Sequence, residues 1–315
     1  MSATILGCRQ ARRQTPCGGS IKSPPTKTTF EEMLTETQFT TDDVTLNLAV
    51  GPASGAPLLL LHGVARRWQD YVTLIPMLMT RWQVFALDFR GHGRSTRAAN
   101  YLVIDYVRDA VQAIEKQCKT PTVVFGHSLG AMVAAAVAAE RAEQVRGVVL
   151  EDPPFGLLGS DVRQTVYHSM FSAYGKLAGT SQSIDELSAR LADVTLDAPG
   201  QAQPLRLGDV RDPAALRFMA SCLAQLDPAV MTPLVEGRWM DGYDQASLLS
   251  RIACPVLLLQ GDEAQGGMLD DRRAAGAVAA LRHATHVKVA TAGHQIHSMQ
   301  TETTLRLVTN FLESL

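Results

Sequence analysis

The clearest candidate for chemistry is Ser128, which lies in the segment Gly126-His127-Ser128-Leu129-Gly130. An apolar run ends just before this segment and an alanine-rich run begins just after it, which predicts a buried strand, a sharp turn and a helix. Side chains two residues before and after a serine on such a turn would collide, so glycine is needed at both places. The pattern predicts a nucleophilic serine; the simpler alternative is an ordinary turn.

Two histidines near the end of the chain could be the base that a serine hydroxyl needs before it attacks a carbonyl. His294 lies in the turn "TAGHQIH" after the last predicted strand, where it can reach the carboxyl edge of a sheet. His297 lies nearer the start of the last predicted helix and has no glycine before it. We therefore favour His294 and keep His297 as the alternative.

The imidazole in turn needs a carboxylate that orients it and stabilises its charged form. Asp152 ends the predicted strand 145–152, and Asp262 directly follows the predicted strand 255–261. Both strand ends can lie near His294 in a parallel sheet. Both aspartates are therefore candidates, and each could instead be a turn or cap residue.

These residues depend on strands and helices that alternate along most of the chain. The predicted strands are 35–41, 44–50, 57–63, 82–88, 121–126, 145–152, 255–261 and 285–290. The predicted helices of the same part are 68–79, 106–117, 128–141, 270–281 and 301–315. This order predicts an α/β fold with a mostly parallel, doubly wound sheet, built from residues 34–152 and 246–315. Residues 153–245 contain helical pieces without a clear strand, and we expect them to form an inserted helical cap over the carboxyl edge.

Composition excludes several classes of function. The formal net charge of the 315-residue chain is −2, which gives no attraction to nucleic acid, and no apolar run is long enough to span a membrane. The five cysteines are scattered, which predicts reduced thiols and a cytoplasmic protein. Residues 1–33 are basic and rich in Ser, Thr, Pro and Gly, which predicts a disordered extension; an organellar import signal is the alternative.

Four segments resemble those of the α/β-hydrolase family, and the resemblance extends from about residue 40 to residue 315. In chain order they are "LLLLHG", "ALDFRGHGRS" (86–95), "GHSLG" and "GH" (293–294). The resemblance implies that Ser128 is the nucleophile on a sharp turn and that His294 is the base.

The family resemblance also bears on the acid. Many relatives carry it three residues after the glycine that ends strand 255–261, and that position is Ala264 here. A subset of the family places the acid 24 residues after the nucleophile, which is Asp152 in this chain. The resemblance therefore favours Asp152, with Asp262 as the alternative acid.

By the same resemblance, the backbone N–H groups of Val64 and Leu129 form the oxyanion hole. Aromatic and methionine side chains of the cap could form an apolar pocket over Ser128. Trp68, at the end of the oxyanion loop, and Trp239 in the cap are the residues that we expect to contact substrate.

These observations predict a serine hydrolase that cleaves a small, fairly apolar carboxylic ester or lactone without a metal or cofactor. A carbon–carbon hydrolase or a cofactor-free haloperoxidase would use the same three side chains and is an alternative. A ligand sensor that retains the pocket only for binding is an alternative of another class. The only expected partner is a small-molecule substrate, and the oligomeric state is not predictable.

Overall fold

The computed structural model describes residues 33–197 and 204–315, so the predicted N-terminal extension lies almost wholly outside the described residues. The main feature of the fold is an eight-stranded sheet with the strand order β1-β2-β4-β3-β5-β6-β9-β10. β2 is antiparallel to both of its neighbours and the other pairs are parallel, which confirms the predicted α/β class. In chain order these strands are β1 (Thr35–Thr40), β2 (Thr45–Val50), β3 (Pro57–Leu61), β4 (Gln83–Leu87), β5 (Thr122–His127), β6 (Val145–Glu151), β9 (Val256–Gly261) and β10 (Ala284–Val289).

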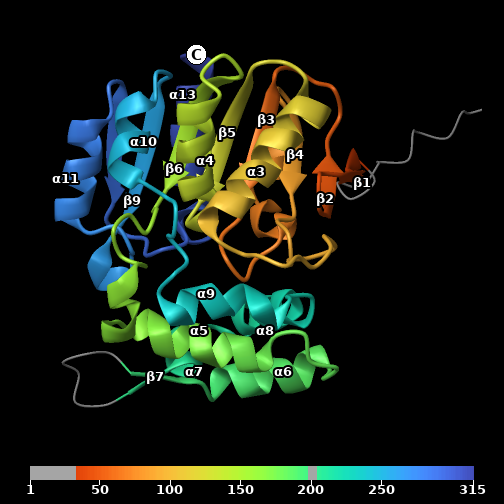
Figure 1. Ribbon diagram of the computed structural model, residues 1–315, viewed down its shortest axis with the longest axis vertical. Helices are drawn as coiled ribbons and strands as arrows, with labels where there is room; N and C mark the ends of the chain where they lie inside the picture. Colours follow the sequence, from red (N-terminus) through yellow and green to blue (C-terminus); the bar gives the residue numbers. More distant parts are fainter. Residues whose placement is uncertain (1–32, 198–203) are drawn as a thin grey trace, which may run out of the picture.

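Helices cover both faces of this sheet (Figure 1). One face packs against α3 (Val103–Ala113), α4 (Leu129–Glu140), α10 (Gln245–Arg251) and α11 (Asp271–Ala280). The other packs against η1 (Trp68–Tyr71), α2 (Ile75–Leu78), α12 (Ile296–Met299) and α13 (Thr301–Glu313). Strand β3 illustrates the cause, because Leu59 and Leu61 enter one apolar cluster while Leu58 and Leu60 enter the other. An uninterrupted apolar run is what a strand buried on both faces requires.

The chain segment that connects β6 to β9 forms a layer of helices at one end of the sheet (Figure 1). It contains η3 (Ser160–Gln164), α5 (Val166–Leu177), α6 (Ile184–Ala192), α7 (Leu207–Val210), α8 (Pro213–Ala224), η4 (Pro228–Val230) and α9 (Met231–Glu236). We call these elements the helical layer. They occupy the region predicted as a cap, but a short antiparallel pair, β7 (Thr195–Leu196) with β8 (Leu205–Arg206), corrects the expectation that it has no strand.

Two predicted helices differ from their observed form. Residues 68–79 form the short 3₁₀ turn η1 and the separate helix α2 rather than one helix, because Pro76 lacks an N–H and fits only the first turn of a helix. The predicted helix 106–117 begins earlier, at Val103, and ends in a π-helical turn, η2 (Ile114–Cys118). A further 3₁₀ turn, η5 (Glu263–Gln265), follows β9.

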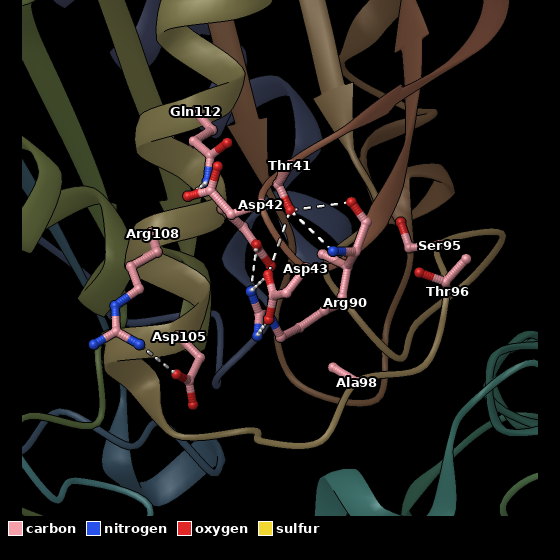
Figure 2. Close-up of polar contacts among 12 residues, drawn as sticks. Thr41, Asp42, Asp43, Arg90, Ser95, Thr96, Ala98, Asp105, Arg108 and Gln112 are labelled. Carbon is pink, nitrogen blue, oxygen red and sulfur yellow. Dashed lines mark hydrogen bonds and ion pairs between the residues drawn. The ribbon is translucent and has the colours of Figure 1, made fainter.

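The loop after β4 is anchored by Arg90, whose side chain is only 3% exposed. Its guanidinium donates to both oxygens of Asp43 at 3.1 Å, which ties the loop to the turn between β1 and β2 (Figure 2). It also donates two hydrogen bonds of 2.7 Å to Asp109 on α3. The anchored loop carries His92, whose Nε2 accepts a hydrogen bond from the Ala65 N–H at 3.2 Å. Arg90 therefore helps to hold the loop after β3 in which the predicted oxyanion donor lies.

In the described part of the chain, no single helix is both long and apolar enough to cross a membrane. The helices Pro213–Ala224 and Pro228–Glu236, which meet at 101°, pass that test only when taken together.

Candidate active site

Ser128 lies on a strained turn between β5 and α4. Its φ of 55° and ψ of −115° are unfavourable for a residue with a side chain, and the side chain lies at the start of α4. A Cβ on Gly126 would lie 2.0 Å from the carbonyl oxygen of Gly130, and a Cβ on Gly130 would lie 1.9 Å from that of Leu61. The two glycines are therefore required by the backbone, and the turn has the geometry that exposes a nucleophile.

His294 and Asp152 form a direct pair next to this turn. The His294 Nδ1 lies 2.7 Å from Asp152 Oδ2, although 142 residues separate them in the chain. The Asp152 carboxylate is fully buried and also accepts hydrogen bonds from the N–H groups of Gly261 at 2.9 Å and Met268 at 2.7 Å. These donors fix the carboxylate, and the carboxylate leaves the His294 Nε2 as the nitrogen able to act as a base.

The alternatives for base and acid have other partners. Asp262 accepts a hydrogen bond from the Ala264 N–H at 3.0 Å and caps η5, as expected of a turn residue. His297 is fully buried against Glu151, with its Nδ1 2.9 Å from Oε1. The structure therefore pairs His294 with Asp152, whereas His297 and Asp262 have other partners.

Ser128 and His294 both line a cavity of about 110 Å³ between the sheet and the helical layer. From the helical layer, Met170 and Phe171 of α5 and Met219 of α8 contribute apolar walls. From the core, the loop after β3 contributes Gly63, Val64, Ala65 and Arg66. A second cavity, of about 740 Å³, shares part of this lining, including Tyr167 and Tyr174.

The predicted oxyanion donors flank the nucleophile. Leu129 is the first residue of α4, and Val64 lines the cavity beside Ser128. Among the described residues, no hydrogen bond uses either N–H group. Both are therefore available for a developing negative charge.

The two residues predicted to contact substrate, Trp68 and Trp239, lie outside the cavity lining. Trp68 is 8% exposed and packs in the apolar cluster on the α13 side of the sheet. Trp239 is fully buried in the cluster on the other side. Neither indole lines the cavity, because both side chains pack in the apolar core. Their position in the chain does not reveal this packing.

His127 directly precedes the nucleophile in the chain and also borders the site. It lines the cavity, and its Nε2 donates to the backbone carbonyl of His294 at 2.8 Å. Burial lowers the pKa of His127 to about 3, so the ring is neutral at pH 7. His127 therefore connects the serine turn to the loop that carries His294.

Behind His127 lies a buried charge cluster that sequence reasoning missed, formed by Asp70, Glu151 and His297. His297 also donates its backbone N–H to Glu151 Oε1 at 2.8 Å, and its Nε2 lies 3.5 Å from Asp70 Oδ2. Burial opposes the charge on the imidazole, but the two carboxylates outweigh it and raise the pKa of His297 to about 10. Burial likewise opposes charge on Glu151, and the His297 cation holds its pKa below the ordinary value.

One signal for this cluster was present in the sequence. Glu151 and Asp152 are the last two residues of the predicted strand 145–152, and successive side chains of a strand point to opposite faces. Two adjacent acids cannot orient the same imidazole. The structure accordingly pairs Glu151 with His297 and Asp152 with His294.

The parallel sheet, the serine on its turn and the Asp152–His294 pair are typical of one class of protein, and comparison with known proteins identifies the same class. Residues 56–298 match the family model described as alpha/beta hydrolase fold, so the chain belongs to that family. A solved structure of E-2-(acetamidomethylene)succinate hydrolase superposes with a TM-score of 0.70 at 22% identity, covering 89% of this chain and 99% of that one.

Two curated relatives indicate the range of the family. The chain is 38% identical over 119 residues to lipase LipV of Mycobacterium tuberculosis, a match covering 37% of this chain and 44% of the lipase. It is 26% identical over 278 residues to 2-(acetamidomethylene)succinate hydrolase of Mesorhizobium japonicum, covering 86% of this chain and 92% of that protein. The chain is therefore similar along most of its length to a hydrolase, and over a shorter stretch to a lipase.

Proposed function

We propose that this protein is a serine hydrolase that cleaves a small carboxylic ester or lactone through an acyl-enzyme on Ser128. One observation carries the proposal. The Asp152–His294 pair, with its 2.7 Å contact, opens onto the same cavity as a serine held at positive φ on a helix N-terminus. The relative named as a lipase supports an ester as the bond cleaved.

In the proposed reaction, His294 Nε2 takes the Ser128 proton as the hydroxyl oxygen attacks the substrate carbonyl. The Val64 and Leu129 N–H groups stabilise the resulting oxyanion, each contributing about 3 kcal/mol. The protonated His294 then gives its proton to the leaving alcohol. A water molecule activated by the same imidazole releases the acid and restores the serine.

The size of the cavity limits the acyl group. At about 110 Å³ it is smaller than the roughly 150 Å³ cavity that holds a benzene ring in an engineered protein. A short acyl chain therefore fits, with the alcohol portion directed toward the larger neighbouring cavity. A carbon–carbon hydrolase or cofactor-free haloperoxidase would use the same residues, and no observation favours either over ester cleavage.

The test is turnover of 4-nitrophenyl acetate by the purified protein and by Ser128→Ala. We expect hydrolysis by the wild type with a burst of nitrophenol, no burst from the variant, and labelling of the wild type alone by a fluorophosphonate. A ligand sensor would bind without turnover. Equal rates from both proteins, or a wild type that neither turns over nor is labelled, would overturn the proposal.

A further inference from the structure

The cavity above Ser128 contains two arginines, which the predicted preference for an apolar substrate does not explain. Arg66 comes from the loop after β3 in the core, and Arg211 comes from the segment between α7 and α8 in the helical layer. They approach the cavity from opposite sides. Of the described residues that line it, none is Asp or Glu, so the lining carries positive charge without a carboxylate.

The charge of Arg211 is not neutralised by the protein within the described residues. Arg211 has no acidic partner there within ion-pair distance, whereas Arg217 of the neighbouring helix α8 pairs with Asp185 on the surface. Arg66 is partly neutralised, because its Nε lies 4.0 Å from Asp70 Oδ1, but that carboxylate already faces His297. The Arg66 side chain is 14% exposed, so its charge is largely removed from water.

The two guanidinium groups border the same cavity. Burial raises the pKa of Tyr174, and the positive charges of Arg66 and Arg211 partly oppose that rise. Tyr174 itself lines the cavity. Partly desolvated, incompletely paired cations beside a nucleophile create a field that favours an anion. A planar guanidinium suits a carboxylate, to which it can donate two parallel hydrogen bonds.

We propose that the substrate carries a free carboxylate in addition to the bond that is cleaved, and that Arg66 and Arg211 bind it. This inference rests on the proposed function and specifies its substrate class. The carboxylate would lie at the arginine side of the cavity while the scissile carbonyl lies over Ser128. Arg211, on the helical layer, would then hold that layer closed over the bound substrate, and Arg66 would anchor the same group to the core.

Two pairs of esters test this proposal, each with the carboxylate present or replaced by an uncharged group of similar shape. Monoethyl succinate against ethyl 4-methylpentanoate places the carboxylate in the acyl part. Acetoxyacetate against isobutyl acetate places it in the alcohol part. We expect kcat/KM for one anionic ester to exceed that of its neutral counterpart by about 10- to 100-fold, the range of one hydrogen-bonded charge.

Variants then assign the preference to the two arginines. Arg211→Gln and Arg66→Gln are expected to reduce the anionic-to-neutral ratio of kcat/KM toward one, mainly through KM, and Arg211→Lys to restore part of it. Arg217→Gln, a surface arginine of the same layer, is the matched control and should keep the wild-type ratio. Because the readout is a ratio within one protein, partial loss of folding does not imitate the effect.

The outcome separates this inference from the proposed function. A wild type that cleaves both neutral esters as well as the anionic ones, or a preference that survives both Arg→Gln changes, would overturn the inference and leave the serine hydrolase intact. Absence of any Ser128-dependent ester cleavage would overturn both.

Discussion

Replacing Asp152 by Asn tests the proposed catalytic geometry most directly. The two oxygens of Asp152 accept hydrogen bonds from His294 Nδ1, from the Met268 N–H and from the Gly261 N–H. An asparagine has only one accepting oxygen, so its NH₂ group must replace either Oδ1 or Oδ2 and then face the hydrogen-bond donors of the oxygen that it replaces. With the NH₂ on the Oδ1 side it opposes Gly261, and on the Oδ2 side it opposes Met268 and donates to His294.

The second arrangement places the imidazole proton on Nε2, where the base should be. In a serine protease with the same pairing this error lowers kcat by about 10⁴, which corresponds to about 5 kcal/mol of activation free energy. We expect a loss of that order for Asp152→Asn, with KM changed little. The assay is the steady-state kcat for ester hydrolysis, with circular dichroism to verify folding.

Asp262→Asn is the matched control. Asp262 only caps η5 through the Ala264 N–H, and asparagine caps nearly as well as aspartate. We expect kcat to stay within about threefold of wild type. An Asp152→Asn enzyme within tenfold of wild type, or an equal loss in Asp262→Asn, would refute the assignment of the acid.

Three further outcomes follow from the structure. Gly130→Ala should abolish activity and lower the melting temperature, because the new Cβ would lie 1.9 Å from the Leu61 carbonyl oxygen; Gly276→Ala, with open space around its Cβ, should not. Glu151→Gln should lower the free energy of unfolding by about 3–5 kcal/mol in urea titrations, because it removes the nearer of the two carboxylates that face buried His297; the exposed Glu143→Gln should change it little. Since the folded pKa of His297 is about 10, above its ordinary value, the stabilisation that it contributes is complete below about pH 6.5 and is lost as the pH rises through 10. Unfolding curves from pH 7 to 10 should therefore show a falling stability in the wild type and a weaker fall in Glu151→Gln, and equal slopes would contradict the buried pair.

Much of the core follows from local rules. Uninterrupted apolar runs such as residues 57–61 require a strand covered on both faces, and their alternation with helical periods predicts the parallel sheet that is observed. The requirement for Gly126 is local in the same sense, because a Cβ there would clash with the carbonyl oxygen of Gly130, four residues later; Gly130 is required by the Leu61 carbonyl of the neighbouring strand β3, which is a tertiary contact. The spacing of serine and glycines in the sequence is therefore enough to predict the turn.

The pairing of acids with histidines does not follow from local rules. It depends on which strand ends become neighbours in the sheet and on the direction that the backbone gives to each side chain. Sequence left Asp152 and Asp262 both open, and only the folded chain aims Asp152 at His294 while Asp262 turns back on its own loop. Neither the inward position of His127 nor the burial of Trp68 has a periodic signal in the sequence.

The amino-acid sequence by itself determined the alternating elements and the strained serine, since steric exclusion and hydrophobic periodicity act over short stretches of chain. The tertiary structure alone decided which carboxylate meets which imidazole, and that Arg66 and Arg211 share a cavity. Those contacts depend on how the helical layer packs against the sheet, and packing between distant surfaces is set by the three-dimensional fit of side chains, for which residue order carries no simple rule.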